Sequence, residues 1–305
     1  MELLYMLEGI RTPILDKLMA LATNLVGETV FLAVAIIIFW CVSKKCGYYI
    51  MTVGFSGTIL NQFLKLWFRI PRPWVKDPDF NIVESARAAA TGYSFPSGHT
   101  QNAFASLGAP AMWTKKKWLK IVLFLFIALV GLSRMYLGVH TPLDVGVSVG
   151  IGLLLILGLY PIFRDMDEKP NRIYITFGLF IILSIAFVLF VELYNFPADI
   201  DPVNYAEGLK NAYMILFCAI GLMIVFYVDR NYLKFDTEAV WWVQIIKAVV
   251  GVGLLVFFKA ALKAPLLSLF NGHPIAHGVR YFILVIFAGL LWPLTFKFFA
   301  KLGKK

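Results

Sequence analysis

The chain has 305 residues, of which 60% are hydrophobic and only 15% are charged, and its mean hydropathy is strongly positive. This balance is typical of a polytopic membrane protein and excludes an ordinary soluble domain. The net charge of +10 could suit a nucleic-acid partner. However, the cations lie in short clusters between apolar runs, as they do when they orient a membrane protein. We therefore expect membrane lipids, and no nucleic acid, as partners.

The first residues, up to about Ala22, are predicted to lie on the membrane surface. Apolar residues recur at helical spacing from Leu3 to Leu18, with charged residues between them. Thr12 followed by Pro13 is typical of a helix start, so the pattern predicts two short helices broken near Gly9. The segment lacks the ordered features of a cleaved signal peptide, and we expect none.

Beyond this segment we expect about nine spans, each near the ~20 residues that cross a bilayer. Their predicted ranges are 25–42, 48–68, 97–113, 119–136, 143–163, 173–194, 212–228, 240–258 and 281–299. The range 97–113 is rich in small residues, which predicts a position inside a bundle. The fold class is therefore all-α: a polytopic transmembrane helical bundle with an interfacial N-terminal helix. We expect one membrane domain over 1–305, with a five-span core (23–163) and four additional spans (164–305).

The loop charges predict an orientation. With nine spans, the loops rich in lysine and arginine share one side with the basic tail formed by Lys301, Lys304 and Lys305. That side is expected to be cytoplasmic, because cations accumulate in cytoplasmic loops. The acidic loop 195–208 then lies on the opposite side, as do the polar clusters described next.

The first polar cluster ends the predicted span 48–68 and contains Lys65 and Arg72. Prolines on both sides of Arg72 fix its backbone, and a guanidinium can hold two phosphate oxygens at once. Alternatively, both cations extend toward lipid headgroups, a role for which Arg69 and Lys76 are better candidates.

The second cluster is Ser97-Gly98-His99, at the predicted start of a helix. A helix N-terminus presents free N–H groups to an anion, Gly98 allows close approach, and Ser97 adds a hydroxyl. Ser97 could equally be a plain helix cap, and His99 could be a packed core histidine.

The third cluster joins Ser133 and Arg134 to His140 and Asp144. Thr141-Pro142 predicts a helix start, which places Asp144 in the first turn, within reach of one ring nitrogen of His140. The other nitrogen could then attack phosphorus. Alternatively, Asp144 only complements the helix dipole.

Cys41 and Cys218 lie in apolar runs, and Cys46 shows no metal spacing with them. We therefore expect buried thiols, no metal and no cofactor.

These clusters resemble the motifs of the type 2 phosphatidic acid phosphatase superfamily: Lys-x6-Arg-Pro, Pro-Ser-Gly-His and Ser-Arg-x5-His-x3-Asp. The predicted nine spans also resemble glucose-6-phosphatase, a relative within it. Together with the orientation that the loop charges predict, this gives an outward-facing active site in a multi-pass protein, for which we expect a bacterial plasma membrane. The resemblance implies that His140, oriented by Asp144, becomes a phosphohistidine while His99 transfers protons. The implied phosphate-binding residues are Lys65, Arg72, Ser97, Gly98 and Arg134.

The expected activity is hydrolysis of a lipid phosphate or diphosphate without a metal. The alternatives are hydrolysis of a soluble sugar phosphate, transfer of the phosphoryl or head group to another alcohol, and non-catalytic lipid transport. The pair of histidines with a carboxylate disfavours transport, because binding alone needs no nucleophile.

A last polar segment lies between the predicted spans 240–258 and 281–299. It contains Lys259, Lys263, His273, His277 and Arg280. These residues could anchor the segment to lipid phosphates, or they could help to select the substrate headgroup.

Overall fold

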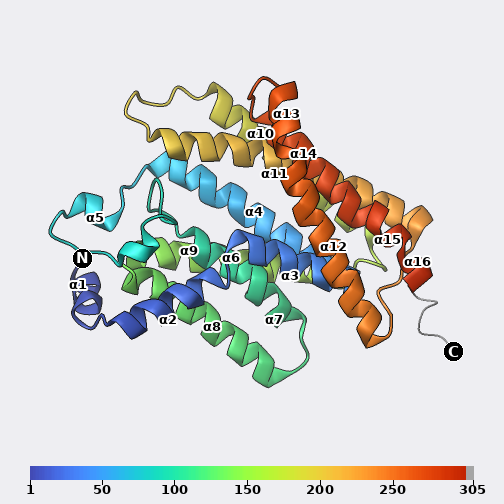
Figure 1. Ribbon diagram of the computed structural model, residues 1–305, viewed down its shortest axis with the longest axis horizontal. Helices are drawn as coiled ribbons and strands as arrows, with labels where there is room; N and C mark the ends of the chain where they lie inside the picture. The colour runs from blue at the N-terminus through green and yellow to red at the C-terminus, as the bar shows by residue number, and fades with distance from the viewer. Residues whose placement is uncertain (300–305) are drawn as a thin grey trace. The chain divides into compact units, whose positions relative to one another are not determined.

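The computed structural model describes residues 1–299, and all regular structure in that range is helical (Figure 1). The helices before residue 140 are α1 (Glu2–Gly9), α2 (Pro13–Asn24), α3 (Glu28–Cys41), α4 (Lys44–Phe68), α5 (Pro73–Lys76), η1 (Glu84–Ala86), α6 (Gly98–Ala103), η2 (Phe104–Gly108), α7 (Ala109–Trp113) and α8 (Lys117–Tyr136). The later helices are α9 (Pro142–Arg164), α10 (Pro170–Leu193), α11 (Pro202–Val228), η3 (Asp229–Leu233), α12 (Trp241–Ala261), α13 (Lys263–Leu269), α14 (Ile275–Ile286), η4 (Phe287–Leu291), α15 (Trp292–Leu294) and α16 (Phe296–Phe299). The all-helical prediction is confirmed. The predicted basic tail (Lys301, Lys304 and Lys305) lies outside the described residues.

The chain divides into two compact units. The first unit comprises Met1–Leu32, Ile50–Pro161 and Asn195–Gly208, and the second comprises Ala33–Tyr49, Ile162–Tyr194 and the chain from Leu209 onward. All three motif clusters belong to the first unit. The polar segment between α12 and α14 belongs to the second.

A test of helix length and apolar composition gives fewer membrane spans than the nine expected from the sequence. Within residues 1–299, six helices are long and apolar enough to cross a membrane: α8, α9, α10, α11 with η3, α12 with α13, and α14 through α16. The bent pair α2 and α3, at 46°, could add a seventh. The predicted spans 48–68 and 97–113 are helical but do not pass, because α4 is too polar and α6 to α7 form only a short run of helix. The expected count of about nine is therefore approximate.

The N-terminal segment folds as its sequence predicts. Two short helices, α1 and α2, are separated near Gly9, and the Thr12 side chain accepts a hydrogen bond from the Leu15 N–H at the start of α2. Ile10, Ile14 and Leu18 remain exposed. An exposed apolar face suits a helix lying on a membrane surface.

The small residues of α6, η2 and α7 pack tightly inside the first unit. Ala103, Ala105 and Ala109 are fully buried, and a Cβ added at Gly152 of α9 would lie 2.3 Å from the Phe104 ring. The interior position expected for 97–113 is therefore present, and it brings the start of α6 close to α9.

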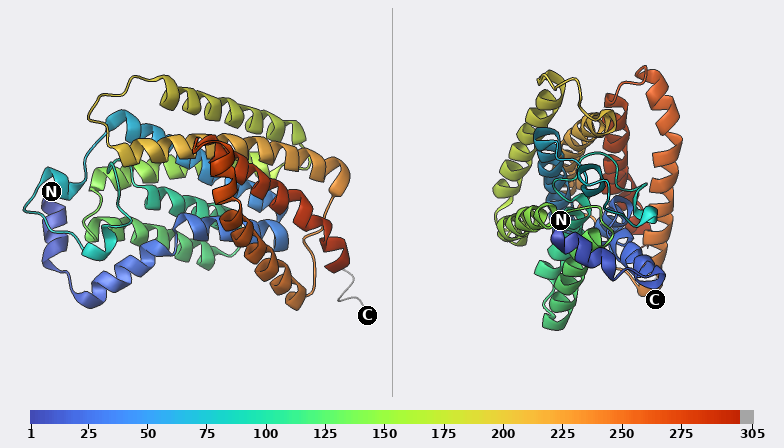
Figure 2. Two further views of the ribbon diagram at one scale, coloured as in Figure 1. Left: turned by 45° about the horizontal axis from the view of Figure 1, so that its top comes forward. Right: turned by 90° about the vertical axis from the view of Figure 1, so that its left-hand side faces the viewer.

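Within the second unit, α10 and the part of α11 after Gly208 run antiparallel (Figure 2). The Tyr213 hydroxyl donates to Glu192 over 2.9 Å, and the Tyr174 and Phe226 rings meet toward the other ends of these helices.

Lys247, inside a predicted span, is 1% exposed, and its Nζ donates to the Trp40 and Thr237 carbonyls. The three cysteines are free thiols, with Cys46 and Cys218 buried and Cys41 half-buried.

Candidate active site

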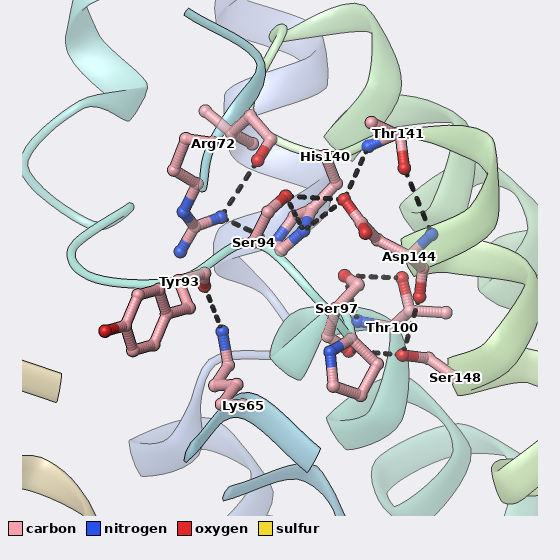
Figure 3. A network of polar contacts seen from close by, with 12 residues as sticks. Lys65, Arg72, Tyr93, Ser94, Ser97, Thr100, His140, Thr141, Asp144 and Ser148 are labelled. Atoms are coloured by element: carbon pink, nitrogen blue, oxygen red, sulfur yellow. Dashed lines mark hydrogen bonds and ion pairs between the residues drawn. The ribbon is translucent and has the colours of Figure 1, made fainter. Parts of the chain in front are cut away.

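His140 lies at the centre of the motif clusters, in the short connection between α8 and α9 (Figure 3). Its Nδ1 lies 3.5 Å from Asp144 Oδ2, and both side chains are almost fully buried. The same carboxylate oxygen accepts a 2.7 Å hydrogen bond from the Thr141 N–H, and the Thr141 hydroxyl accepts from the Asp144 N–H. The predicted helix start at Thr141-Pro142 therefore also fixes the carboxylate that faces the histidine.

Ser94 is a further member of this group that the sequence analysis did not single out. Its hydroxyl donates to Asp144 Oδ2 and lies 3.5 Å from His140 Nδ1, while its backbone N–H donates to the Ile70 carbonyl. Ser94 is fully buried. Because it contacts both the carboxylate and the ring, Ser94 helps to orient the pair.

Arg72 approaches the opposite side of the imidazole. Its Nη1 lies 3.0 Å from His140 Nε2 and also donates to the Val139 carbonyl. Its Nε and Nη2 donate to the carbonyls of Gly92 and Thr91. Burial lowers the pKa of Arg72 to about 10, which leaves it a cation at neutral pH. The guanidinium is thus fixed by three backbone carbonyls directly beside the candidate nucleophile.

The protonation state of His140 follows from these surroundings. Burial lowers its pKa well below the ordinary value, and the nearby charges of Arg72, Arg134 and Lys65 lower it further. The imidazole is therefore neutral at pH 7. With a hydrogen on Nδ1 facing Asp144, its lone pair is on Nε2, on the side of Arg72.

Lys65 is anchored by the loop that also binds Arg72. Its Nζ donates to the Tyr93 carbonyl over 2.6 Å, and the residue is 7% exposed (Figure 3). Lys65 comes from α4 and Arg72 from the segment after it. The loop Thr91–Ser94 thus positions both cations and the serine beside Asp144.

The Ser97-Gly98-His99 cluster begins α6, as predicted. The Ser97 hydroxyl accepts hydrogen bonds from the N–H and the hydroxyl of Thr100, so it caps the helix. The Ser97 carbonyl accepts from Ser148 of α9, and its N–H donates to the Asp144 carbonyl. These bonds place the N-terminus of α6 next to the first turn of α9, and His99 in the first turn of α6.

Arg134, in the last turn of α8, has N–H donors that form no hydrogen bond with the described residues. It is 1% exposed, and its Nη1 donates to the Thr23 hydroxyl of α2 over 3.2 Å. Among the described residues, its Nε and Nη2 have no hydrogen-bond partner. Buried donors of this kind are costly unless an anion uses them. Ser133, by contrast, bonds to the Val130 carbonyl of its own helix.

The C-terminal polar residues belong to the second unit. Within the second unit, Lys259 and Arg280 lie over the Tyr281 ring at 5.7 and 5.3 Å, and His273 contacts the ring of Tyr213. Arg280 is 7% exposed. A role in substrate selection for these three residues, and for Lys263 and His277, stays a prediction. In the described part of the chain, no three His, Cys, Asp or Glu residues are grouped as a metal site would need.

A neutral histidine between a carboxylate and an arginine, with further cations nearby, is chemically suited to attack the phosphorus of a phosphate ester. Comparison with known proteins agrees. Residues 45–168 match the PAP2 superfamily, and residues 213–305 match the transmembrane extension of PAP2 superfamily phosphatases.

Phosphatidylglycerophosphatase B of Bacillus subtilis is 31% identical over 53% of this chain and 80% of its own length. The undecaprenyl-diphosphatase BcrC of the same organism is 30% identical over 43% of this chain and 67% of its own. The crystal structure of Aquifex aeolicus LpxE aligns with 51% of this chain and 91% of that one, at 31% identity and a TM-score of 0.47. The chain belongs to the PAP2 superfamily, and it is a multi-pass membrane phosphatase.

Proposed function

We propose that this protein hydrolyses a phosphorylated lipid through a phosphohistidine on His140, at the non-cytoplasmic face of the membrane. The observation that carries the proposal is the position of the His140 ring, with Nδ1 facing Asp144 and Nε2 facing Arg72. The relatives named as phosphatases of phosphatidylglycerophosphate and undecaprenyl diphosphate support a lipid substrate. So do the apolar helices around the site, in which a lipid tail can remain.

In the first step, the Nε2 lone pair of His140 attacks phosphorus and the bond from phosphorus to the alcohol oxygen breaks. His99 takes up a proton once the phosphate anion is bound, and it gives that proton to the departing alcohol. The phosphorylated ring is cationic, and the Asp144 carboxylate, 3.5 Å from Nδ1, stabilises it. Asp144 also keeps the hydrogen on Nδ1, so that Nε2 is the nucleophile.

In the second step, neutral His99 takes a proton from water, whose oxygen attacks phosphorus. The bond from phosphorus to Nε2 breaks, His140 regains its lone pair, and inorganic phosphate leaves. Lys65, Arg72 and Arg134 neutralise the phosphoryl oxygens in both steps, helped by the Ser97 hydroxyl and the Gly98 N–H. The uncommitted N–H groups of Arg134 are the donors best suited to this role.

The test is phosphate release by purified protein from lipid monophosphates, lipid diphosphates and sugar phosphates, with an acid-labile, alkali-stable phosphoenzyme trapped during turnover. We expect release from a lipid substrate, and neither release nor phosphoenzyme from His140→Ala. Release only from sugar phosphates would favour a soluble substrate. Capture of the phosphoryl group by an added alcohol would favour a transferase. Near-normal turnover by His140→Ala would refute the mechanism.

A further inference from the structure

The first turns of α11 belong to the same compact unit as the candidate active site. This segment, Asp201–Gly208, lies between the two stretches that match family models, 45–168 and 213–305. Its acidic residues were expected only to face away from the cytoplasm. The structure places it against the loop that holds Lys65 and Arg72.

Close contacts define which face of α11 meets the catalytic loop. The Asp201 N–H donates to the Tyr93 hydroxyl over 3.0 Å, and a Cβ added at Gly92 would lie 2.7 Å from the Asn204 side chain. One helical turn later, a Cβ added at Gly208 would lie 2.7 Å from Leu66, the residue after Lys65. The face of α11 that carries Asn204 and Gly208 therefore packs on the backbone that positions both cations.

Asn204 carries a polar group that this packing does not use. The residue is 1% exposed, and its backbone N–H donates to the Asp201 carboxylate over 2.6 Å. Its side-chain Nδ2 is buried with no hydrogen-bond partner among the described residues. A buried amide donor without a partner is unfavourable. Its retention beside Gly92, whose carbonyl binds Arg72, points to a ligand that accepts this hydrogen bond.

Glu207 lies three residues after Asn204, and so on the same side of α11. It is half-buried, and in the described part of the chain its carboxylate makes neither an ion pair nor a hydrogen bond. Its negative charge acts on both Lys65 and Arg72. A free acceptor and a free donor thus share one face of α11, next to the cations expected to hold the phosphate.

We propose that Asn204 and Glu207 form a leaving-group subsite, which selects lipid monophosphates carrying a hydroxyl next to the scissile ester and disfavours diphosphates. A hydroxyl can accept from the Asn204 amide and donate to the Glu207 carboxylate at the same time. A second phosphate would bring more negative charge toward Glu207, which is unfavourable. The inference rests on the proposed function, whose substrate class it narrows.

The test compares kcat/KM for three lipids with one tail: a monophosphate with the neighbouring hydroxyl, its deoxy analogue, and the diphosphate. For the wild type we expect the hydroxylated monophosphate to be favoured over each of the others by about tenfold or more. Glu207→Gln should raise the ratio of diphosphate to monophosphate activity about tenfold, because it removes the charge and keeps the shape. Asn204→Leu should remove most of the preference for the hydroxyl. Glu168→Gln, at an exposed position of the second unit, is the matched control.

The outcomes separate the two proposals. If the wild type hydrolyses the lipids but does not distinguish the hydroxyl from its deoxy analogue, the subsite is wrong and the proposed function stands. The same holds if Glu207→Gln leaves the diphosphate ratio at the wild-type value. Because Glu207 is half-buried, this variant is expected to fold even where Asn204→Leu does not. If the wild type releases phosphate from none of the lipids, the proposed function fails, and the subsite fails with it.

Discussion

Replacing Asp144 with asparagine tests the orientation and charge of the catalytic pair while preserving its shape. The asparagine oxygen can still accept from the Thr141 N–H and the Ser94 hydroxyl, which now bind the carboxylate. Both donors bind Oδ2, the oxygen that also faces His140 Nδ1, so the asparagine oxygen stays beside the ring. A neutral oxygen is a weaker acceptor than a carboxylate, so the variant weakens both the orientation of the ring and the stabilisation of its phosphorylated, cationic form.

The size of the effect follows from the 3.5 Å separation of His140 Nδ1 and Asp144 Oδ2. The phosphorylated ring carries a positive charge, and its attraction to a carboxylate at that distance is about 5 kcal/mol at an effective dielectric constant of about 20. Each 1.36 kcal/mol is roughly a tenfold change in rate, so the upper bound is slightly above three orders of magnitude. Because the asparagine keeps part of the geometry, we expect kcat to fall between about a hundredfold and a thousandfold.

The assay is the single-turnover rate of phosphate release by purified Asp144→Asn, together with its melting temperature. Asp79→Asn, an exposed aspartate of the same unit, provides the matched control and should behave as wild type. A rate for Asp144→Asn within about threefold of wild type, with an unchanged melting temperature, would show that the carboxylate neither orients nor stabilises the ring.

Four further outcomes are expected. Because folding lowers the pKa of His140, the unfolded chain binds the extra proton below about pH 6.5. The free energy of unfolding should therefore fall as the pH drops below that value. In His140→Gln, melting curves recorded over the same pH range should show a smaller fall, and an equal pH dependence in the two proteins would contradict the prediction. Chelation by EDTA should change turnover little, whereas full inactivation rescued by a divalent cation would indicate a metal enzyme. In intact cells, an impermeant thiol reagent should label Asp199→Cys but not Lys116→Cys in a cysteine-free background, and the reverse would overturn the orientation. Lys263→Ala and Arg280→Ala should raise KM or change substrate preference while turnover persists, and wild-type kinetics across the lipid panel would leave their segment only an anchor.

Local sequence signals predicted the ends of helices well. Thr12, Ser97 and Thr141 each cap a helix in the structure, because a hydroxyl followed by a helix start is decided within a few residues. The motif spacing likewise predicted that Arg72, His140 and Asp144 belong to one site, but it did not predict the distances between their side chains.

Contacts between distant segments were missed for a physical reason. Ser94 meets Asp144 across 50 positions, and Arg134 meets Thr23 across 111, and no local pattern encodes either pairing. The strict count of spans falls below nine where the interior is polar. Because α4 and the run from α6 to α7 are buried among other helices, their small and polar residues need not satisfy lipid.

The bond between Thr23 and Arg134 ties one amphipathic helix to the candidate phosphate site. On its other side, α2 exposes Ile14, Leu18 and Leu21 to whatever surrounds the protein. A detergent micelle that does not reproduce the bilayer surface would tilt or release this helix, and Arg134 would lose its only side-chain partner among the described residues. The choice of solubilising agent therefore affects catalysis. Between nanodiscs and micelles, the affinity for phosphate should differ more than any other kinetic property.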